Sequence, residues 1–182
     1  TEVALWMIEV YGLELATRRV GEVVDLVCKQ NPFHPVREHL LGLEWDGRPR
    51  ASRWLTDYIG ASDTELHWRY SEAWLVGCVA RVMKPGCKVD SVLILKGSQG
   101  SLKSTALRAL AGGEWFSDST IDIRSKDAYS SVSGVWIYEL AELDSINRRD
   151  NSTVKAFLTA QVDKYRPPYA RRDIRVPRQC VF

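Results

Sequence analysis

The first half of the chain alternates hydrophobic and polar residues with the period of a helix. Within residues 1–29, branched and aromatic apolar side chains recur at intervals of three and four positions, which predicts an amphipathic helix. Asn31–Pro35 ends this pattern because it carries two prolines. Further helices are predicted at 36–42, at 53–59 with Gly60 as the C-terminal cap, and at 68–83. We therefore expect residues 1–90 to form a mainly helical N-terminal region.

The pattern changes after Asp90. Val92–Leu95 is a short apolar run rich in branched residues, which favours a buried strand. A loop rich in glycine and serine follows, and a helix is predicted at 103–111. Further strands are predicted at 135–138 and 175–182, with a helix capped by Ser152 or Thr153 between them. Strands that alternate with helices are typical of a parallel sheet covered by helices, so residues 91–182 should form an α/β, three-layer core.

Composition narrows the class of protein. The chain has 182 residues, 45% hydrophobic and 26% charged, which is typical of a globular protein. The net charge of +2 does not by itself indicate a nucleic-acid partner. The cysteines show no C-x-x-C spacing, and we expect them to be reduced thiols of a cytoplasmic protein. No apolar run reaches the length of a membrane span, so we expect no membrane partner.

The clearest candidate for chemistry is a phosphate-binding loop. Residues 97–104 read Gly-Ser-Gln-Gly-Ser-Leu-Lys-Ser. In such a loop glycines let backbone N–H groups turn toward phosphates, a lysine reaches the outer phosphates, and a hydroxyl binds Mg²⁺. The alternative is a chance turn before a helix. The candidate nucleotide-binding residues are Gly97, Ser98, Gln99, Gly100, Ser101, Leu102, Lys103, Ser104 and Thr105.

Leu102 departs from the usual pattern, which has glycine directly before the lysine. We expect it to take a right-handed helical conformation, because a positive φ costs a leucine about 1–2 kcal/mol. The predicted strand before the loop and the predicted helix after it are the context that such a loop requires.

An acidic segment follows the strand predicted at 135–138. Glu139 lies at the end of that strand and Glu142 just beyond it. A P-loop ATPase needs a carboxylate for its Mg²⁺ shell and a second group that orients the attacking water. We assign Glu139 to the metal and Glu142 to the water, with the reverse assignment open. The alternative is a solvated acidic loop.

Basic and aromatic residues gather in residues 163–178. The cations are Lys164, Arg166, Arg171, Arg172, Arg175 and Arg178, interspersed with Tyr165 and Tyr169 and opposed by Asp163 and Asp173. Such a mixture suits single strands, whose bases stack on aromatic rings while phosphates pair with cations. Arg171 or Arg172 is a candidate to stabilise the transferring phosphoryl group at the ATP site of a neighbouring subunit. The alternative is an ordinary charged hairpin.

Taken together, these motifs resemble the virulence-associated protein E family of phage and mobile-element proteins. That family is similar to superfamily-three helicases, in the AAA+ branch of P-loop ATPases. The resemblance is carried by Asn31–Arg37, Leu43–Arg50, Trp54–Leu55, Val82–Asp90, Gly97–Thr105, Ser125–Tyr129, Trp136–Leu143, Lys155–Thr159 and Asp163–Phe182. It implies a P-loop NTPase core, an ATP- and Mg²⁺-dependent helicase-like activity in DNA replication, a homo-oligomeric ring, and single-stranded or forked DNA as the partner.

The resemblance also implies roles for single residues. Lys103 and Ser104 would bind phosphate and Mg²⁺, and Glu139 and Glu142 would take the acidic roles. The candidate DNA-binding residues are Lys155, Lys164, Tyr165, Arg166 and Tyr169. The polar residue that senses the γ-phosphate would follow Phe182, so we expect the ATPase core in this chain to be truncated at its C-terminus.

Two other functions remain open. The first is a non-hydrolysing nucleotide- or DNA-binding module with a degenerate P-loop, which Leu102 favours. The second is a P-loop phosphotransferase acting on a small molecule, against which the basic segment argues.

Overall fold

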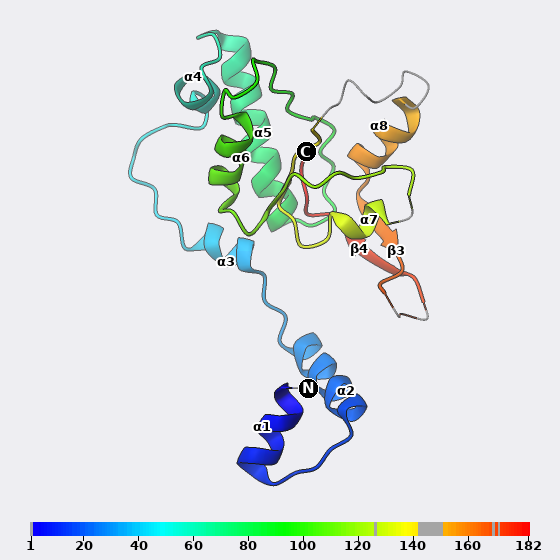
Figure 1. The fold of residues 1–182 in the computed structure, drawn as a ribbon. Coiled ribbons are helices and arrows are strands. Elements are labelled where there is room, and N and C mark those ends of the chain that lie inside the picture. The colour runs from blue at the N-terminus through cyan, green and yellow to red at the C-terminus, as the bar shows by residue number, and fades with distance from the viewer. Residues whose placement is uncertain (1, 126, 142–150, 169, 171) are drawn as a thin grey trace. The chain divides into compact units, whose positions relative to one another are not determined.

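The computed structural model describes residues 2–125, 127–141, 151–168, 170 and 172–182, and the chain divides into two compact units, residues 1–38 and 39–182. The first unit contains helices α1 (Glu2–Tyr11) and α2 (Thr17–Gln30), drawn in blue in Figure 1. The sequence predicts one helix here, but α1 ends where Gly12 takes a positive φ of 65°. Gly12 and Leu13 then bond back to the carbonyls of Ile8 and Met7, and this closes the helix.

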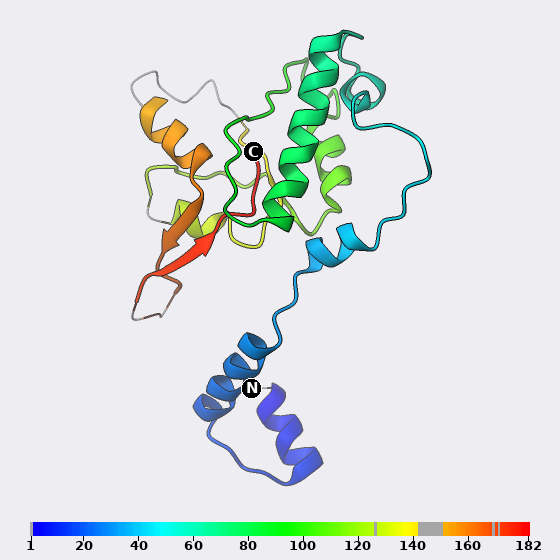
Figure 2. The same cartoon turned by 180° about the vertical axis from the view of Figure 1, so that it is seen from behind.

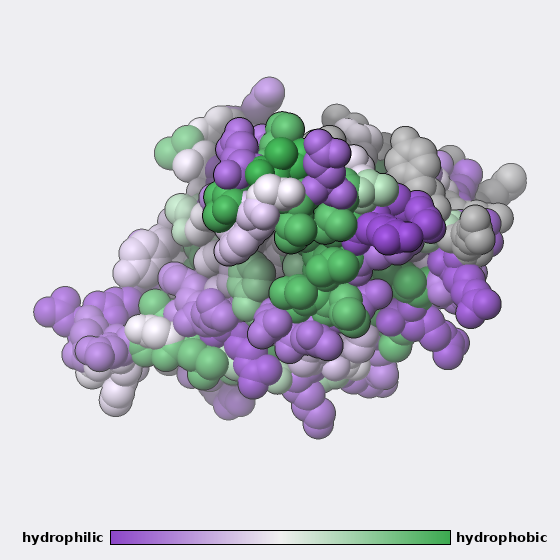
Figure 3. All heavy atoms as spheres, turned by 90° about the horizontal axis from the view of Figure 1, so that it is seen from below, coloured by the Kyte–Doolittle hydropathy of each residue, from purple (hydrophilic) through white to green (hydrophobic). Residues whose placement is uncertain are grey.

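The two helices of the first unit leave most of their apolar side chains exposed. Val20 is the one buried hydrophobic residue of these two helices. Hydrophobic side chains are accordingly conspicuous at the surface in Figure 3. The large exposed ones in these helices are Val3, Leu5, Trp6, Ile8, Val10, Tyr11, Val23, Val24, Leu26 and Val27.

Helix α3 (Pro35–Leu41) spans the division between the units, and α4 (Trp54–Ile59) and α5 (Glu65–Met83) follow. As predicted, α4 ends at Gly60, which adopts the left-handed conformation with φ 78°. Helix α5 begins earlier than predicted because the Thr64 side chain accepts the N–H of His67 and caps it. The described elements before residue 90 are all helical. The domain division predicted near residue 90 stays a prediction.

Short parallel strands lie at the centre of the second unit. Strand β1 (Phe116–Ser117) pairs in parallel with β2 (Ile137–Tyr138), and Ile137 also forms a parallel bridge with Val181. The N–H of Leu93 donates to the carbonyl of Phe182 at 3.3 Å. Four segments therefore lie in the order 116–117, 137–138, 181–182 and 93. The α/β class is confirmed, but the predicted strand at 92–95 is wrong, since one hydrogen bond does not make a ladder.

The remaining elements surround these segments. They are α6 (Lys103–Ala111), α7 (Ala128–Ser131), α8 (Asn151–Thr159) and an antiparallel hairpin of β3 (Val162–Tyr165) and β4 (Ile174–Pro177). Helix α6 has the predicted bounds. Because α8 begins at Asn151, Ser152 and Thr153 lie inside it, so the predicted cap is wrong. Both views in Figures 1 and 2 place α4, α5 and α6 on one side of the C-terminal segment and α7, α8 and the hairpin on the other.

A cluster of aromatic and small side chains fills the core beside the hairpin. Its buried members are Ala128, Val132, Tyr138, Phe157, Cys180 and Phe182. Burial raises the pKa of the Cys180 thiol to about 12, so it stays protonated. None of the described helices combines the length and the apolar character needed to cross a membrane.

Candidate functional site

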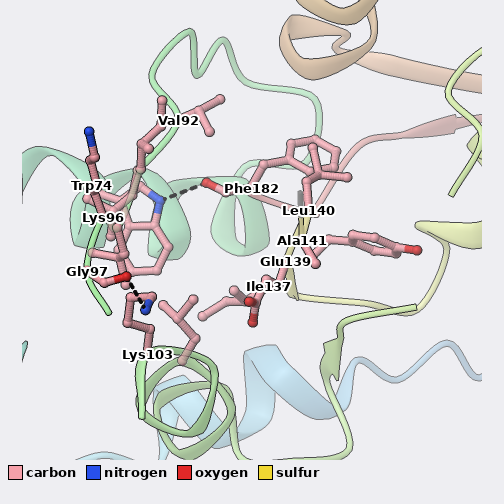
Figure 4. A pocket seen from close by; sticks show the side chains of 15 residues that line it. Trp74, Val92, Lys96, Gly97, Lys103, Ile137, Glu139, Leu140, Ala141 and Phe182 are labelled. Atoms are coloured by element: carbon pink, nitrogen blue, oxygen red, sulfur yellow. Dashed lines mark hydrogen bonds between the residues drawn. The ribbon is translucent and has the colours of Figure 1, made fainter. Parts of the chain in front are cut away.

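The loop before α6 holds its lysine against its own oxygens. Lys103 Nζ donates to the carbonyls of Gly97 and Ser98 at 3.2 and 2.8 Å, and to Ser101 Oγ at 2.9 Å. Ser101 Oγ in turn donates to the carbonyl of Ser98 at 2.8 Å. Lys103 is the first residue of α6, and Figure 4 shows its side chain turned back toward Gly97. The ammonium group therefore lies at the start of the helix and donates hydrogen bonds to three oxygen atoms of the loop.

Leu102 takes the left-handed conformation, with φ 58° and ψ 22°. It is the one non-glycine residue with a positive φ in the described part of the chain. The prediction of a right-handed conformation is therefore wrong. Leu102 takes this conformation directly before α6, and glycine would take it without the steric cost of a Cβ. The Leu102 side chain is 69% exposed, so it does not fill the loop.

Ser104 and Glu139 meet although 35 residues separate them: Ser104 Oγ donates to Glu139 Oε1 at 2.7 Å. Ser104 lies in the first turn of α6 and Glu139 directly follows β2. The N–H of Glu139 donates to the carbonyl of Ser117 at 2.8 Å, which continues the pairing of β1 with β2. The second carboxylate oxygen, Oε2, is buried and has no hydrogen-bond partner among the described residues. A buried oxygen without a partner is costly, so this position favours a donor or a cation.

A cavity of about 530 Å³ lies between the loop and the end of β2. Figure 4 shows Lys103 on one side and Glu139 on another, with the ring of Trp74 forming part of the wall. Trp74 Nε1 donates to the carbonyl of Phe182 at 3.1 Å, which fixes that wall. The volume falls within the roughly 300–1,000 Å³ typical of small-molecule sites. The cavity thus combines apolar walls with two lysines, Lys96 and Lys103, and one carboxylate.

The hairpin carries cations on its exposed face. Lys164 lies directly opposite Arg175 in the register, and both side chains are exposed. Like charges in such cross-strand positions repel. Asp173 contacts both Lys164 at 3.5 Å and Arg166 at 3.3 Å. One carboxylate therefore forms ion pairs with two cations, and the exposed face has an excess of positive charge.

Arg178 does not belong to this exposed face. It is buried, its Nε donates to Asp163 Oδ1 at 2.9 Å, and it also bonds to the carbonyl of Phe157. Its guanidinium lies over the rings of Phe157 and Phe182, 4.7 and 5.4 Å from their centroids. The hypothesis that all six cations of residues 163–178 are available to DNA is therefore wrong for Arg178. Its carboxylate partner and the aromatic rings hold it in the core.

The other residues predicted to bind DNA or to act on a neighbouring ATP differ in how exposed their side chains are. Tyr165 is half-buried, and its hydroxyl donates to Ser133 Oγ at 3.1 Å, which ties the hairpin to the turn after α7. Lys155 on α8 and Arg172 at the hairpin tip are exposed. Their roles stay predictions. Glu142, Tyr169 and Arg171 lie outside the described residues.

Sequence reasoning missed Trp74, and it named Ser101 without foreseeing its contact with the lysine. The helical periodicity of α5 places Trp74 in the core, but no sequence signal directs it toward the loop. Ser101 contacts the lysine through a turn geometry that is visible only in three dimensions.

The chain matches the model of a protein family. The model of a virulence-associated protein E-like domain matches residues 40–182. This range includes the loop at 97–105, Glu139 and the hairpin. Comparison with curated proteins gives no match to the chain.

Proposed function

Because the chain belongs to the virulence-associated protein E-like family, we propose that it binds and hydrolyses ATP with Mg²⁺, as the helicase-like ATPase of phage or mobile-element DNA replication. One contact supports this proposal above all: the 2.7 Å hydrogen bond between Ser104 and Glu139. It joins a hydroxyl beside the loop lysine to a carboxylate at the end of a parallel strand. A P-loop ATPase needs these two groups side by side around its metal ion.

The phosphates would be bound by residues 97–104 and the start of α6. Backbone N–H groups at a helix N-terminus favour anions. Lys103 donates to three neutral oxygens, two of them carbonyls. A phosphate oxygen carries more negative charge than a carbonyl or a hydroxyl. The ammonium group would therefore leave these partners for the outer phosphates.

The residues beside the loop fit Mg²⁺. Oxygen ligands suit this ion, and Ser104 Oγ and the Glu139 carboxylate supply them. The buried Oε2 of Glu139, which has no partner in the described part of the chain, would gain one. Bound Mg²⁺ neutralises the charge that develops on the phosphate oxygens. Glu142, which lies two residues beyond Leu140, is proposed to orient the attacking water.

The proposed fold of residues 91–182 is a P-loop core with a parallel sheet between helices. The segments 116–117, 137–138 and 181–182 pair in parallel, and the segment that leads into the loop bonds to Phe182. In such sheets ligands bind at the carboxyl ends of the strands. Glu139 directly follows β2 and so lies at that end.

Single-stranded or forked DNA is the proposed partner. Lys164, Arg166 and Arg175 are exposed on one hairpin. Asp173 is the carboxylate that pairs with both Lys164 and Arg166. Phosphates of a single strand would pair with such cations. A homo-oligomeric ring would bring several hairpins around one strand, and Arg171 or Arg172 would reach the ATP of a neighbouring subunit.

A second function has one observation in its favour. Leu102 stands where the usual loop has glycine, and its φ of 58° is strained for leucine. A loop that has lost its glycine would suit a module that binds nucleotide without hydrolysing it.

Steady-state ATP hydrolysis with Mg²⁺, with and without single-stranded DNA, separates the two functions. We expect Glu142→Gln to bind ATP and to hydrolyse it roughly 10²-fold or more slowly. Glu114→Gln, a change at an exposed glutamate, is the matched control. Loss of hydrolysis in Glu139→Gln with a nearly silent Glu142→Gln would exchange the two roles. ATP binding without hydrolysis in the wild-type chain would favour the second function.

A further inference from the structure

A second cavity, of about 560 Å³, lies between α4, α5 and α6. The proposed roles of the phosphate loop and the hairpin do not involve it. Its walls include Trp54, Tyr58, Leu75, Ala106, Ala109 and Leu110. It is therefore lined almost entirely by aromatic and aliphatic side chains, from three helices of the same compact unit.

This cavity begins close to the phosphate loop. Ala106 lies three residues after Lys103 on α6, which is about 5 Å along the helix axis. Trp54 stacks on Trp74 with ring centroids 5.6 Å apart, and Trp74 lines the cavity that contains Lys103 and Glu139. One indole of this stacked pair therefore lines each cavity. On α6, the wall of the second cavity begins at Ala106, about one helical turn after the lysine of the phosphate loop.

The chemistry of the walls favours a flat, uncharged ring. Arg50 is the one charged residue that lines the cavity. Both of its terminal nitrogens donate to the carboxylate of Asp46, at 2.8 and 2.7 Å. The Arg50 hydrogen bonds lower the pKa of Asp46 to about 2, so the pair is ionised at neutral pH. Because this cation is already paired, the cavity offers little attraction to a second phosphate. Aromatic side chains instead stack with planar rings.

We propose that this cavity binds the purine base of the nucleotide whose triphosphate lies at residues 97–104, an inference that rests on the proposed nucleotide binding. The larger purine ring system covers more apolar wall than a pyrimidine does. Among the lining residues, only Arg50, Trp54 and Tyr58 have side chains that can donate hydrogen bonds to the substituents of the ring. A site built from apolar contacts discriminates weakly between such substituents. The cavity should therefore accept adenine and guanine alike, with affinities within about tenfold.

The test compares the affinities of ATP, GTP and inorganic tripolyphosphate for the chain, each with Mg²⁺. Ala109→Leu fills the cavity, and Tyr58→Ala removes an aromatic wall whose side chain is 66% exposed, so the fold should tolerate it. Ala156→Leu, at an exposed position on α8, is the matched control. We expect the first two changes to weaken ATP about tenfold. The affinity for tripolyphosphate should not change, and the control should bind both as the wild type does.

Several outcomes would overturn the inference. One is equal affinity of the wild type for ATP and tripolyphosphate, and another is unchanged ATP affinity in both cavity variants. GTP binding weaker than ATP by more than about 100-fold would contradict an apolar base site. Failure of the wild type to bind either ATP or tripolyphosphate would instead reject the proposed function, and the base site with it.

Discussion

Replacing Leu102 by glycine should stabilise the protein. The left-handed φ of 58° at this position costs a leucine about 1–2 kcal/mol. The side chain is 69% exposed, so little apolar contact is lost when it is removed. Glycine adds chain entropy to the unfolded state, which costs roughly 0.5–1 kcal/mol. The difference predicts that Leu102→Gly raises the free energy of unfolding by roughly 0.5–1 kcal/mol.

Urea denaturation measures this difference, with Leu43→Gly as the control. Leu43 is also exposed but has no positive φ. The same chemical change there should lower the free energy of unfolding, because only the entropic cost remains. Leu102→Gly should also leave ATP binding intact, since glycine is the usual residue at this position of the loop. If both variants were destabilised equally, the left-handed conformation of Leu102 and the strain derived from it would be refuted.

Two further predictions concern the hairpin. Asp163→Asn should lower the free energy of unfolding by about 3–5 kcal/mol, because it leaves the buried Arg178 without its counter-charge. Combining Asp163→Leu with Arg178→Met should recover most of this loss in urea denaturation. The pKa of Arg81 is lowered by its burial and, to a smaller extent, by the Arg178 charge, which the double change removes. Arg175→Ala should reduce by about 1 the slope of log affinity for single-stranded DNA against log salt concentration. An unchanged slope, equal to that of the exposed-lysine control Lys84→Ala, would remove Arg175 from the DNA interface.

Local sequence signals predicted the elements around the site well. Glycines and serines followed by Lys103 indicated a loop that opens a helix, and α6 has the predicted bounds. Gly60 ends α4 as expected, because glycine enters the left-handed region without strain. A carboxylate at the end of a buried strand was expected beside the loop, and Glu139 lies there.

The features that the sequence did not predict depend on tertiary contacts. The conformation of Leu102 follows from how the loop meets α6, which overrides the intrinsic preference of leucine. Val92–Leu95 is apolar enough for a strand, yet the described pairing is one bond from Leu93 to Phe182. Arg178 is indistinguishable from its basic neighbours by composition, and only the fold places it beside Asp163. Spacing along the chain does not reveal which charges are buried.

ATP binding by Lys103→Ala tests the central claim most directly. Isothermal titration with Mg²⁺ and ATP should show binding to the wild type and to Lys84→Ala. Lys103→Ala should show no binding and unchanged thermal unfolding, because the contacts of Lys103 Nζ are with loop residues that are exposed. A folded Lys103→Ala variant that binds ATP with wild-type affinity would contradict the assignment of residues 97–104 as the phosphate site.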